Sequence, residues 1–423
     1  MLQLKGPIRI HAPGSVATPF QVRCVVCGQE ISVKTYRTDC SSCGGALGFT
    51  YPDESRSWAG GGGSMWRYRQ RLPVDVRAAI VSMGEGGTPQ LRAQSQTRFE
   101  LFLKNETLNP TGSHKDRALS IGITKAREFG FDTCMLYSDG SAALSSAAYA
   151  ARAGMRNIAL VPRGTSDNRL LPLMVYDSEV LEFAGDAADA LAWVHEACQS
   201  LGIYETSTYR KANPYESEGP KTIGYEIFED LGEAPDWVVV PVGGGGTLAG
   251  IWRGFCDLYD MGLTRKIPRI VGVLPEGFRL LQLGLTRGVE TGEDLRKLAD
   301  FDLPETAQVK IAMSWPPDGI EAIRAVRESD GQFLFASDKE AWQAQGMLGA
   351  REGIYAEVSA AVALVGVENL HKQGYIADGE KVVAIVCGSG FRETAELAPH
   401  VPAKRIEVNR TNGFDKLKRL LKG

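Results

Sequence analysis

Residues 236–258 constrain the fold of this chain more than any other segment. Asp236 to Val242 form a hydrophobic run that predicts a buried strand, Gly243 to Thr247 form a glycine-rich loop, and Leu248 to Leu258 predict a helix. Such a strand, loop and helix N-terminus make an anion site, because backbone N–H groups converge there and the helix dipole favours negative charge. Gly60 to Gly63 are equally rich in glycine, but no strand precedes them, so we interpret them as a linker.

The glycine loop also fits a second interpretation. Gly244, Gly246 and Ala249 match the G-x-G-x-x-A pattern of dinucleotide-binding folds. That pattern needs an acidic residue about 20 positions downstream. The next acid at the end of a predicted strand, Glu276, lies further along the chain. The pattern is weak by itself, and the lysine described next favours an aldehyde cofactor over NAD.

Lys115 lies between a β-rich run and a helical run. Phe99 to Leu103 precede it, Ala118 to Glu128 follow it, and the turn between them is rich in Asn, Pro, Gly and Ser. A lysine held at such a corner, where its amine can lose a proton, can form a Schiff base with an aldehyde cofactor. The alternative is an ordinary capped helix start, where Asn-Pro and a Ser with a following Asp are common.

Short β-rich runs alternate with helical runs along most of the chain. The predicted strands are Thr133–Tyr137, Ile158–Val161, Ser178–Phe183, Val238–Val242, Ile270–Leu274 and Val382–Cys387, and the predicted helices include Ala142–Ala153, Ala187–Leu201 and Tyr355–Lys372. This alternation predicts an α/β fold with a parallel sheet covered by helices on both faces. The 423 residues, 43% of them hydrophobic, suffice for one large two-lobed enzyme or two domains with a small module.

Four of the eight cysteines form two close pairs near the N-terminus. Cys24 and Cys27 are followed, after twelve intervening residues, by Cys40 and Cys43, and a glycine follows each pair. Two such turns offer four thiolates to a tetrahedral zinc ion, which predicts a structural zinc in a ribbon-like module over residues 20–50. The alternative is a redox-active or disulfide-bonded set, which a cytosolic chain disfavours.

The net charge and the N-terminal sequence limit the kinds of partner that the protein can have. The net charge of −4 and the pI near 5.9 give no electrostatic footprint for nucleic acid or an acidic membrane. Met1 to Val16 lack the apolar core of a signal peptide, and no stretch approaches transmembrane length. We therefore expect a soluble cytoplasmic protein that binds a small molecule, and neither nucleic acid nor a membrane.

The lysine and glycine motifs together resemble those of fold-type II pyridoxal phosphate (PLP) enzymes, and most closely those of threonine synthases. The resemblance covers nearly the whole chain beyond residue 60 and is weakest from about residue 277 to 340. It implies an α/β fold of two lobes, each with a mainly parallel sheet flanked by helices, behind a four-cysteine module. Residues 65–130 and 216–423 would form a large PLP-binding domain, and residues 131–215 a small mobile domain. A homodimer is the expected assembly.

The resemblance implies roles for individual residues. Lys115 would carry the cofactor as a Schiff base and act as the catalytic base. The implied cofactor-binding residues are Lys115, His114, Ser141, Gly243, Gly244, Gly245, Gly246, Thr247 and Cys387. His114 resembles the phosphate-contacting histidine of tryptophan synthase. Cys387 stands where the family has a Ser or Thr at the pyridine nitrogen, and a thiol is a weak partner; a buried cysteine at a strand end is the alternative.

Two segments depart from the threonine synthase pattern. Residues 138–142 replace Ser-Thr-Gly-Asn-Thr, so that Ser141 replaces the Asn and Asp139 adds a negative charge beside the substrate carboxylate. Glu216 stands where an Arg would hold the substrate phosphate, and Gly246 replaces an Asn that also reaches it. The implied substrate-binding residues are Ser138, Asp139, Gly140, Ala142 and Glu216.

These motifs predict a PLP-dependent lyase or synthase that eliminates or replaces a side-chain group of a small amino acid other than phosphohomoserine. Threonine synthase proper and a serine/threonine dehydratase-like ammonia-lyase are the alternatives within this family. A non-enzymatic or NAD-binding protein on a similar α/β frame is the alternative outside it. The choice between elimination and replacement is not encoded in these motifs.

Overall fold

The computed structural model describes residues 20–32, 36–52, 63–94, 98–393, 400, 407, 410 and 413–421. Met1 to Val16 and most of the predicted linker, Gly60 to Gly62, lie outside the described residues. The chain divides into two compact units, residues 1–392 and residues 393–423. The second unit contains helix α13 (Gly413–Leu420), and the first contains every element discussed below.

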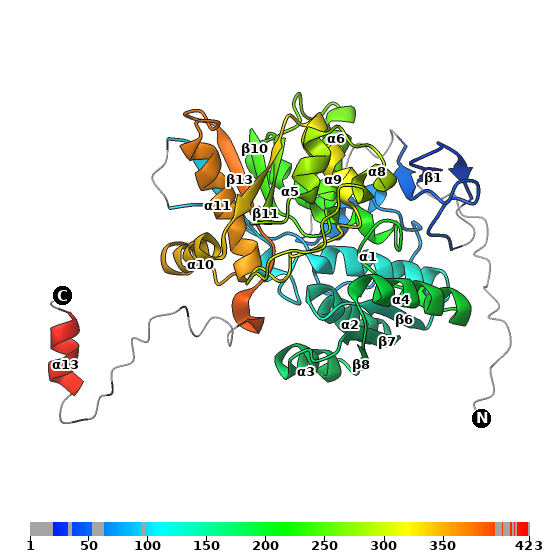
Figure 1. The fold of residues 1–423 in the computed structure, drawn as a ribbon, viewed down its shortest axis with the longest axis horizontal. Coiled ribbons are helices and arrows are strands. Elements are labelled where there is room, and N and C mark those ends of the chain that lie inside the picture. Colours follow the sequence, from blue (N-terminus) through cyan, green and yellow to red (C-terminus); the bar gives the residue numbers. More distant parts are fainter. Residues whose placement is uncertain are drawn as a thin grey trace. The chain divides into compact units, whose positions relative to one another are not determined.

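Six strands form the larger sheet, in the order β12-β11-β10-β13-β5-β4, of which β10, β11 and β13 are labelled in Figure 1. They are β4 (Gln90–Arg92), β5 (Glu100–Asn105), β10 (Trp237–Pro241), β11 (Arg269–Pro275), β12 (Gln332–Ala336) and β13 (Lys381–Val386). Neighbouring strands are parallel, except that β4 pairs antiparallel with β5 at one edge. The central strands β10 and β13 are buried almost throughout, which is why each is a continuous apolar run without alternation.

Helices lie on both sides of this sheet. In Figure 1 the strands β10, β11 and β13 run between α10 and α11 on one side and α5, α6 and α9 on the other. The bounds are α5 (Lys221–Leu231), α6 (Gly246–Asp260), α7 (Leu280–Thr286), α8 (Gly292–Arg296), α9 (Gly319–Glu328), α10 (Asp338–Met347) and α11 (Val358–Lys372). Short helical segments are η2 (Met65–Arg71), η3 (Glu106–Leu108), η4 (Glu216–Glu218), η5 (Leu348–Glu352) and η6 (Gly390–Arg392).

A smaller sheet of four parallel strands has the order β8-β7-β6-β9. Its strands are β6 (Thr133–Tyr137), β7 (Arg156–Pro162), β8 (Glu179–Phe183) and β9 (Tyr204–Glu205). The helices packed with it are α1 (Lys115–Glu128), α2 (Ser141–Ala153), α3 (Asp167–Val175) and α4 (Ala187–Leu201). All four strands come from residues 131–215, the segment predicted as a small domain, and its mobility stays a prediction.

The N-terminal module is a three-stranded antiparallel sheet of β1 (Gln21–Cys24), β2 (Glu30–Ile31) and β3 (Leu47–Thr50). Aromatic side chains fix it to the rest of the first unit. The Phe49 ring lies 5.3 Å from that of Tyr215, and the Tyr51 hydroxyl donates to a Glu218 oxygen at 3.0 Å. The module is therefore packed on the larger body, and its strands face η4 and α5.

The predicted elements agree well with the structure, with informative exceptions. The α/β architecture with mainly parallel sheets is confirmed. The helix predicted from Tyr355 begins at Val358, because Glu357 is extended and occupies the N-cap position. Strand β12, in the stretch where the resemblance is weakest, was not among the predicted strands. No helix in the described ranges is long and apolar enough to cross a membrane.

Candidate active site

A cavity of about 470 Å³ opens where strands of both sheets end. Residues that follow the carboxyl ends of β6, β10 and β13 form its wall, as is usual for ligand sites in parallel α/β folds. Among the predicted residues it is lined by His114, Lys115, Ser138, Asp139, Gly140, Ser141, Ala142, Gly243, Gly244, Gly245, Gly246, Thr247 and Cys387. Glu216 is not part of this lining.

Lys115 is the first residue of α1 and extends its amine into this cavity. The Nζ atom donates a hydrogen bond to Thr208 Oγ1 at 2.8 Å. Burial lowers the pKa of Lys115, because desolvation disfavours the charged ammonium. A partly deprotonated amine is what a lysine needs to attack an aldehyde.

A buried ion network fixes the helix that carries Lys115. The side chain of Arg117 is fully buried and lies 2.7 Å from both a Glu106 and a Glu226 oxygen. Lys104 Nζ lies 3.0 Å from Glu226 as well. Removing one partner from such a buried network typically costs about 3–5 kcal/mol, because an uncompensated charge remains. The N-terminus of α1 is therefore held rigidly against η3 and α5.

The glycine loop faces Lys115 from the start of α6. Gly245 has φ +94°, a left-handed conformation that suits glycine. A Cβ at Gly246 would lie 2.5 Å from Asp318 Oδ2, and one at Gly243 would lie 3.1 Å from Ile311 Cα. The loop thus has no room for side chains on that face. What it offers to a ligand is its backbone N–H groups, at the N-terminus of the fifteen-residue helix α6. This cradle fits a phosphate group.

His114 links the lysine turn to the glycine loop and to the end of β13. Its Nδ1 lies 3.1 Å from the Cys387 carbonyl oxygen, and its Nε2 lies 3.0 Å from Thr247 Oγ1. Burial lowers the pKa of His114 to about 4, with the neighbouring Lys115 charge adding to the effect. The ring is therefore neutral near pH 7. Because a carbonyl only accepts, we assign the proton to Nδ1, which leaves Nε2 to accept from the Thr247 hydroxyl.

The thiol of Cys387 lies in the cavity wall at the end of β13. Its side chain is buried, and the Sγ atom is 3.9 Å from the Ile385 carbonyl oxygen, a weak contact. Burial raises the pKa of this thiol, so it remains protonated. A neutral, weakly bonding group therefore occupies the position predicted to face a pyridine nitrogen.

The N-terminus of α2 forms the wall opposite the glycine loop. Asp139, which the sequence left as an uncompensated negative charge, lies 2.6 Å from Arg169 Nη1. Ser141 Oγ accepts a hydrogen bond from Arg392 Nη2 at 2.6 Å. Lys310 also lines the cavity, with its Nζ 3.6 Å from where a Cβ on Gly140 would be. Cations therefore surround this helix start, and Asp139 is paired.

Glu216 lies behind the cavity, inside the protein. Its side chain is 1% exposed, and one of its oxygens accepts from Asn213 Nδ2 at 2.9 Å. The same oxygen would be 2.0 Å from a Cβ on Gly122 of α1. Burial raises the pKa of Glu216 well above its ordinary value, because desolvation disfavours the charged carboxylate. The carboxyl group that replaces the family's Arg at this position therefore does not face the cavity.

Asp318 and Thr208 are among the residues near the site that the sequence did not predict. Asp318 lies against the glycine loop, and its backbone N–H donates to the Gly244 carbonyl at 2.9 Å. Burial raises the pKa of its carboxyl to about 7. Thr208, the partner of the Lys115 amine, comes from a loop after β9. Neither belongs to a motif, and only the missing side chain at Gly246 hints that another group fills that space.

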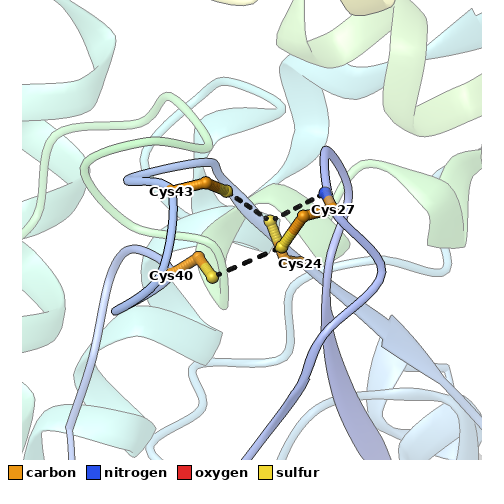
Figure 2. A group of neighbouring side chains, drawn as sticks. All are labelled: Cys24, Cys27, Cys40 and Cys43. Atoms are coloured by element: carbon orange, nitrogen blue, oxygen red, sulfur yellow. Dashed lines mark hydrogen bonds between the residues drawn. The ribbon is translucent and has the colours of Figure 1, made fainter.

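The four predicted zinc ligands converge in the N-terminal module. Figure 2 shows their side chains pointing toward one another from two turns, and all four sulfur atoms lie within 4.8 Å. Cys24 and Cys43 are 3.5 Å apart, and Cys27 and Cys40 are 3.7 Å apart. Zn–S bonds of about 2.3 Å in a tetrahedron separate sulfurs by about 3.8 Å. All eight cysteines, each in the described part of the chain, are free thiols.

Comparison with known proteins gives a consistent match for the larger body. The family model of the pyridoxal-phosphate-dependent enzymes matches residues 81–388. A threonine synthase of Methanocaldococcus jannaschii is 32% identical over 418 residues, which are 95% of this chain and 99% of that protein. A threonine synthase of Mycobacterium tuberculosis is 32% identical over 79% of this chain and 90% of its own length.

Solved structures show the same fold. The crystal structure of O-ureido-L-serine synthase matches with a TM-score of 0.62 and 22% identity, over 75% of this chain and 94% of that one. Maize serine racemase matches with a TM-score of 0.61 and 17% identity, over 79% and 92%. At these identities the similarity concerns the fold alone.

Proposed function

The chain belongs to the family of pyridoxal-phosphate-dependent enzymes, and from this premise we propose that it eliminates or replaces a side-chain group of a small amino acid. The observation that carries the proposal is a single cavity that combines the Lys115 amine, the glycine loop of α6 and the N-terminus of α2. The first would hold the cofactor covalently, the second its phosphate, and the third the substrate.

The chain's own residues fit PLP in this cavity. Lys115 has the lowered pKa that favours a bond to the cofactor aldehyde. The backbone N–H groups of the glycine loop would receive the phosphate, with the Thr247 hydroxyl and its neutral acceptor His114 beside them; the Cys387 carbonyl orients the His114 ring. Bound there, PLP supplies an electron sink for bonds broken at the substrate α-carbon. The neutral Cys387 thiol would leave the ring nitrogen without a strong partner.

Lys115 would also move the proton at the α-carbon. The Lys115 amine lies in the cavity with a lowered pKa, so it would be available as a base for that proton. Thr208 would hold that amine, because its hydroxyl already accepts from Nζ at 2.8 Å. Transfer of the α-carbon proton would thus rest on Lys115 of α1, and orientation of its amine on Thr208 of the loop after β9.

The start of α2 would bind the substrate carboxylate. Its backbone N–H groups point to the cavity, the helix dipole favours an anion, and Arg392 and Ser141 lie beside it. Asp139 does not oppose this role, since Arg169 neutralises it. A small amino acid therefore suits the space between this helix and Lys115.

We do not assign phosphohomoserine as the substrate. A phosphate carries nearly two negative charges at neutral pH and needs cations or converging N–H donors. Glu216, buried behind the cavity, stands at the position of the family's Arg. Gly246, with the Asp318 carboxyl behind it, stands at the position of the loop Asn. The phosphate ligands are thus missing at both places. Beside the glycine loop, the acidic group is Asp318, whose pKa burial raises to about 7.

Threonine synthase proper is the second candidate function. The threonine synthase of Methanocaldococcus jannaschii aligns with the chain over 95% of this chain and 99% of that protein. Lys310 also lines the cavity and would bring positive charge at a different place from the family's Arg. A serine/threonine dehydratase-like reaction would use the same cavity, with water as the nucleophile of the final hydrolysis.

One experiment separates these candidates. The PLP-loaded protein is assayed with a panel of small amino acids and with phosphohomoserine, measuring keto acid, ammonia, phosphate and threonine. Our proposal expects turnover of a neutral small amino acid and weak activity on phosphohomoserine. A kcat/KM of about 10⁴ M⁻¹s⁻¹ or above on phosphohomoserine would replace the proposal by threonine synthase. A protein that takes up no PLP would refute both.

We further propose that the four-cysteine cluster binds one structural zinc ion. Backbone N–H groups of Val26 and Ser42 lie 3.4 Å from the sulfurs of Cys24 and Cys40, as donors that stabilise thiolates. Four sulfurs leave no open coordination position, which is typical of structural sites. The ion would therefore hold the module together and take no part in the chemistry.

A further inference from the structure

We propose that a second cavity, between the four-cysteine module and the larger body, binds a small oxyanion and that its occupancy adjusts the Lys115 site. This junction cavity has a volume of about 240 Å³. Strands β1 and β3 of the module form one wall, and η4, α5, α6 and the loop after β9 form the other. It is separate from the cavity that contains Lys115, since the two share no lining residue.

The charged side chains of the junction cavity favour an anion. The lining contains the cations Arg23, Arg210, Lys221 and Arg253 and the carboxylates Glu218 and Asp257. Lys221 is already satisfied, because its Nζ lies 2.8 Å from Glu218 and 3.3 Å from Asp257. Arg253 donates from Nη1 to Glu321 at 2.8 Å and from Nη2 to the Ser217 carbonyl at 2.6 Å. The donors left to recognise a ligand are therefore Nε and Nη2 of Arg210, with Nε of Arg253 beside them.

Arg210 and Arg253 have buried donors without hydrogen bonds. Arg210 is 5% exposed, and among the described residues its Nε and Nη2 donate to no acceptor. Glu321 lies 2.9 Å from that Nε, but outside hydrogen-bond geometry, and Glu218 lies 3.7 Å from Nη2. Arg253 Nε also makes no hydrogen bond and is 3.6 Å from Glu218. Buried guanidinium donors are costly to leave unsatisfied.

An oxyanion would complete this arrangement. Carboxylate and phosphate groups accept in the forked geometry that guanidinium groups present, and such bonds are stronger than neutral ones. Burial, and after it the neighbouring Arg253 charge, lowers the pKa of Arg210, and the charge of an anion would offset both effects. The volume suits a small metabolite that carries one of these groups.

The chain segment after β9 connects the junction cavity with the catalytic lysine. Thr208, which accepts from Lys115 Nζ at 2.8 Å, precedes Arg210 by two residues. The backbone N–H of Arg210 donates to Asp318 Oδ1 at 2.9 Å, and the Asp318 N–H donates to the Gly244 carbonyl at 2.9 Å. A shift of Arg210 on ligand binding would therefore reach the lysine partner and the glycine loop together. This coupling rests on the proposed role of Lys115, whereas anion binding does not.

Calorimetric titration of the PLP-loaded full chain tests the binding. Inorganic phosphate and succinate are titrated separately, which distinguishes phosphate-bearing from carboxylate-bearing ligands. We expect saturable binding of at least one, weakened about tenfold or more by Arg253→Gln. Val25→Phe, at a half-exposed residue of the lining, should block the cavity without removing a charge. Arg156→Gln, on the exposed surface of β7, is the control and should leave binding unchanged.

The outcomes decide both parts of the proposal. Binding of neither anion, or binding that persists unchanged in Val25→Phe, overturns the site; if Arg253→Gln fails to fold, Val25→Phe still decides. For the coupling, the absorbance of the lysine-bound cofactor is followed while the bound anion is added. A change in the pH midpoint of that band in the wild type, lost in Val25→Phe, supports the coupling, and an unchanged midpoint at saturation overturns it. A protein without a cofactor band refutes the proposed function, while the titration still tests the junction cavity.

Discussion

The Lys115 cavity and the four-cysteine cluster show two ways in which one chain gathers reactive side chains. In the cavity, a lysine, a glycine loop and a helix N-terminus face about 470 Å³ of space. In the cluster, four sulfurs lie within 4.8 Å of one another and leave no space for a substrate. Open sites perform chemistry and closed sites hold structure. The predictions below test this difference between an open and a closed site.

Replacing Lys115 should have the largest effect on activity. In Lys115→Ala, the covalent link to the cofactor and the base for the α-carbon proton are both lost, so we expect turnover to fall by about 10⁴-fold or more. The melting temperature should stay close to that of the wild type, because Arg117 fixes α1 independently. Absorbance spectra and steady-state rates measure this. Lys211→Ala, at an exposed position in the same region of the chain as Thr208, is the control and should change neither.

Replacing one cysteine of the cluster should show the opposite pattern. Cys40→Ser removes one of four zinc ligands, so we expect loss of most of the bound metal and a destabilisation of several kcal/mol. The rate per correctly folded molecule should change far less. Metal analysis, thermal unfolding and activity corrected for the folded fraction provide the measurements. Cys256→Ser, outside the cluster, should retain the metal. A wild-type protein purified without zinc would contradict this prediction.

A side chain on the glycine loop should weaken cofactor binding. In Gly246→Ala, the new Cβ would meet Asp318 Oδ2 at 2.5 Å, so the loop must shift and we expect PLP affinity to fall about tenfold or more. Gly346→Ala is the matched control, because no atom lies within 4 Å of its added Cβ on helix α10. Equilibrium titration with PLP measures both. An additional Asp318→Ala substitution should restore part of the affinity, and its failure to do so would contradict the clash.

Asp318 should give the smallest effect, a pH dependence of cofactor affinity. Burial raises its pKa to about 7, so the folded state binds this proton more tightly than the unfolded chain does. Its contribution to stability therefore falls as pH rises from the ordinary carboxyl value through about 7. Above that pH the ionised carboxylate faces the glycine loop, and PLP affinity should fall about tenfold. Titrations at pH 6 and 8 should show this dependence in the wild type and a flatter one in Asp318→Asn.

The sequence predicts local motifs of this protein better than it predicts the groups that surround them. The strand, glycine loop and helix at residues 236–258 are readable because burial, glycine content and helix periodicity are properties of one continuous segment. The partners of Lys115 and Gly246 are not readable, since Thr208 and Asp318 reach the site only through the packing of distant loops. The sequence also cannot tell that Glu216 points into the protein, because side-chain direction on η4 depends on its packing against α1.

The most direct test of the account is to locate the covalent link to the cofactor. The purified PLP-loaded protein is reduced with borohydride, digested and analysed by mass spectrometry. Our account predicts a single reduced pyridoxyl adduct, on Lys115. An adduct on another lysine, such as Lys310 in the same cavity, or no adduct in a protein that contains PLP, would contradict it.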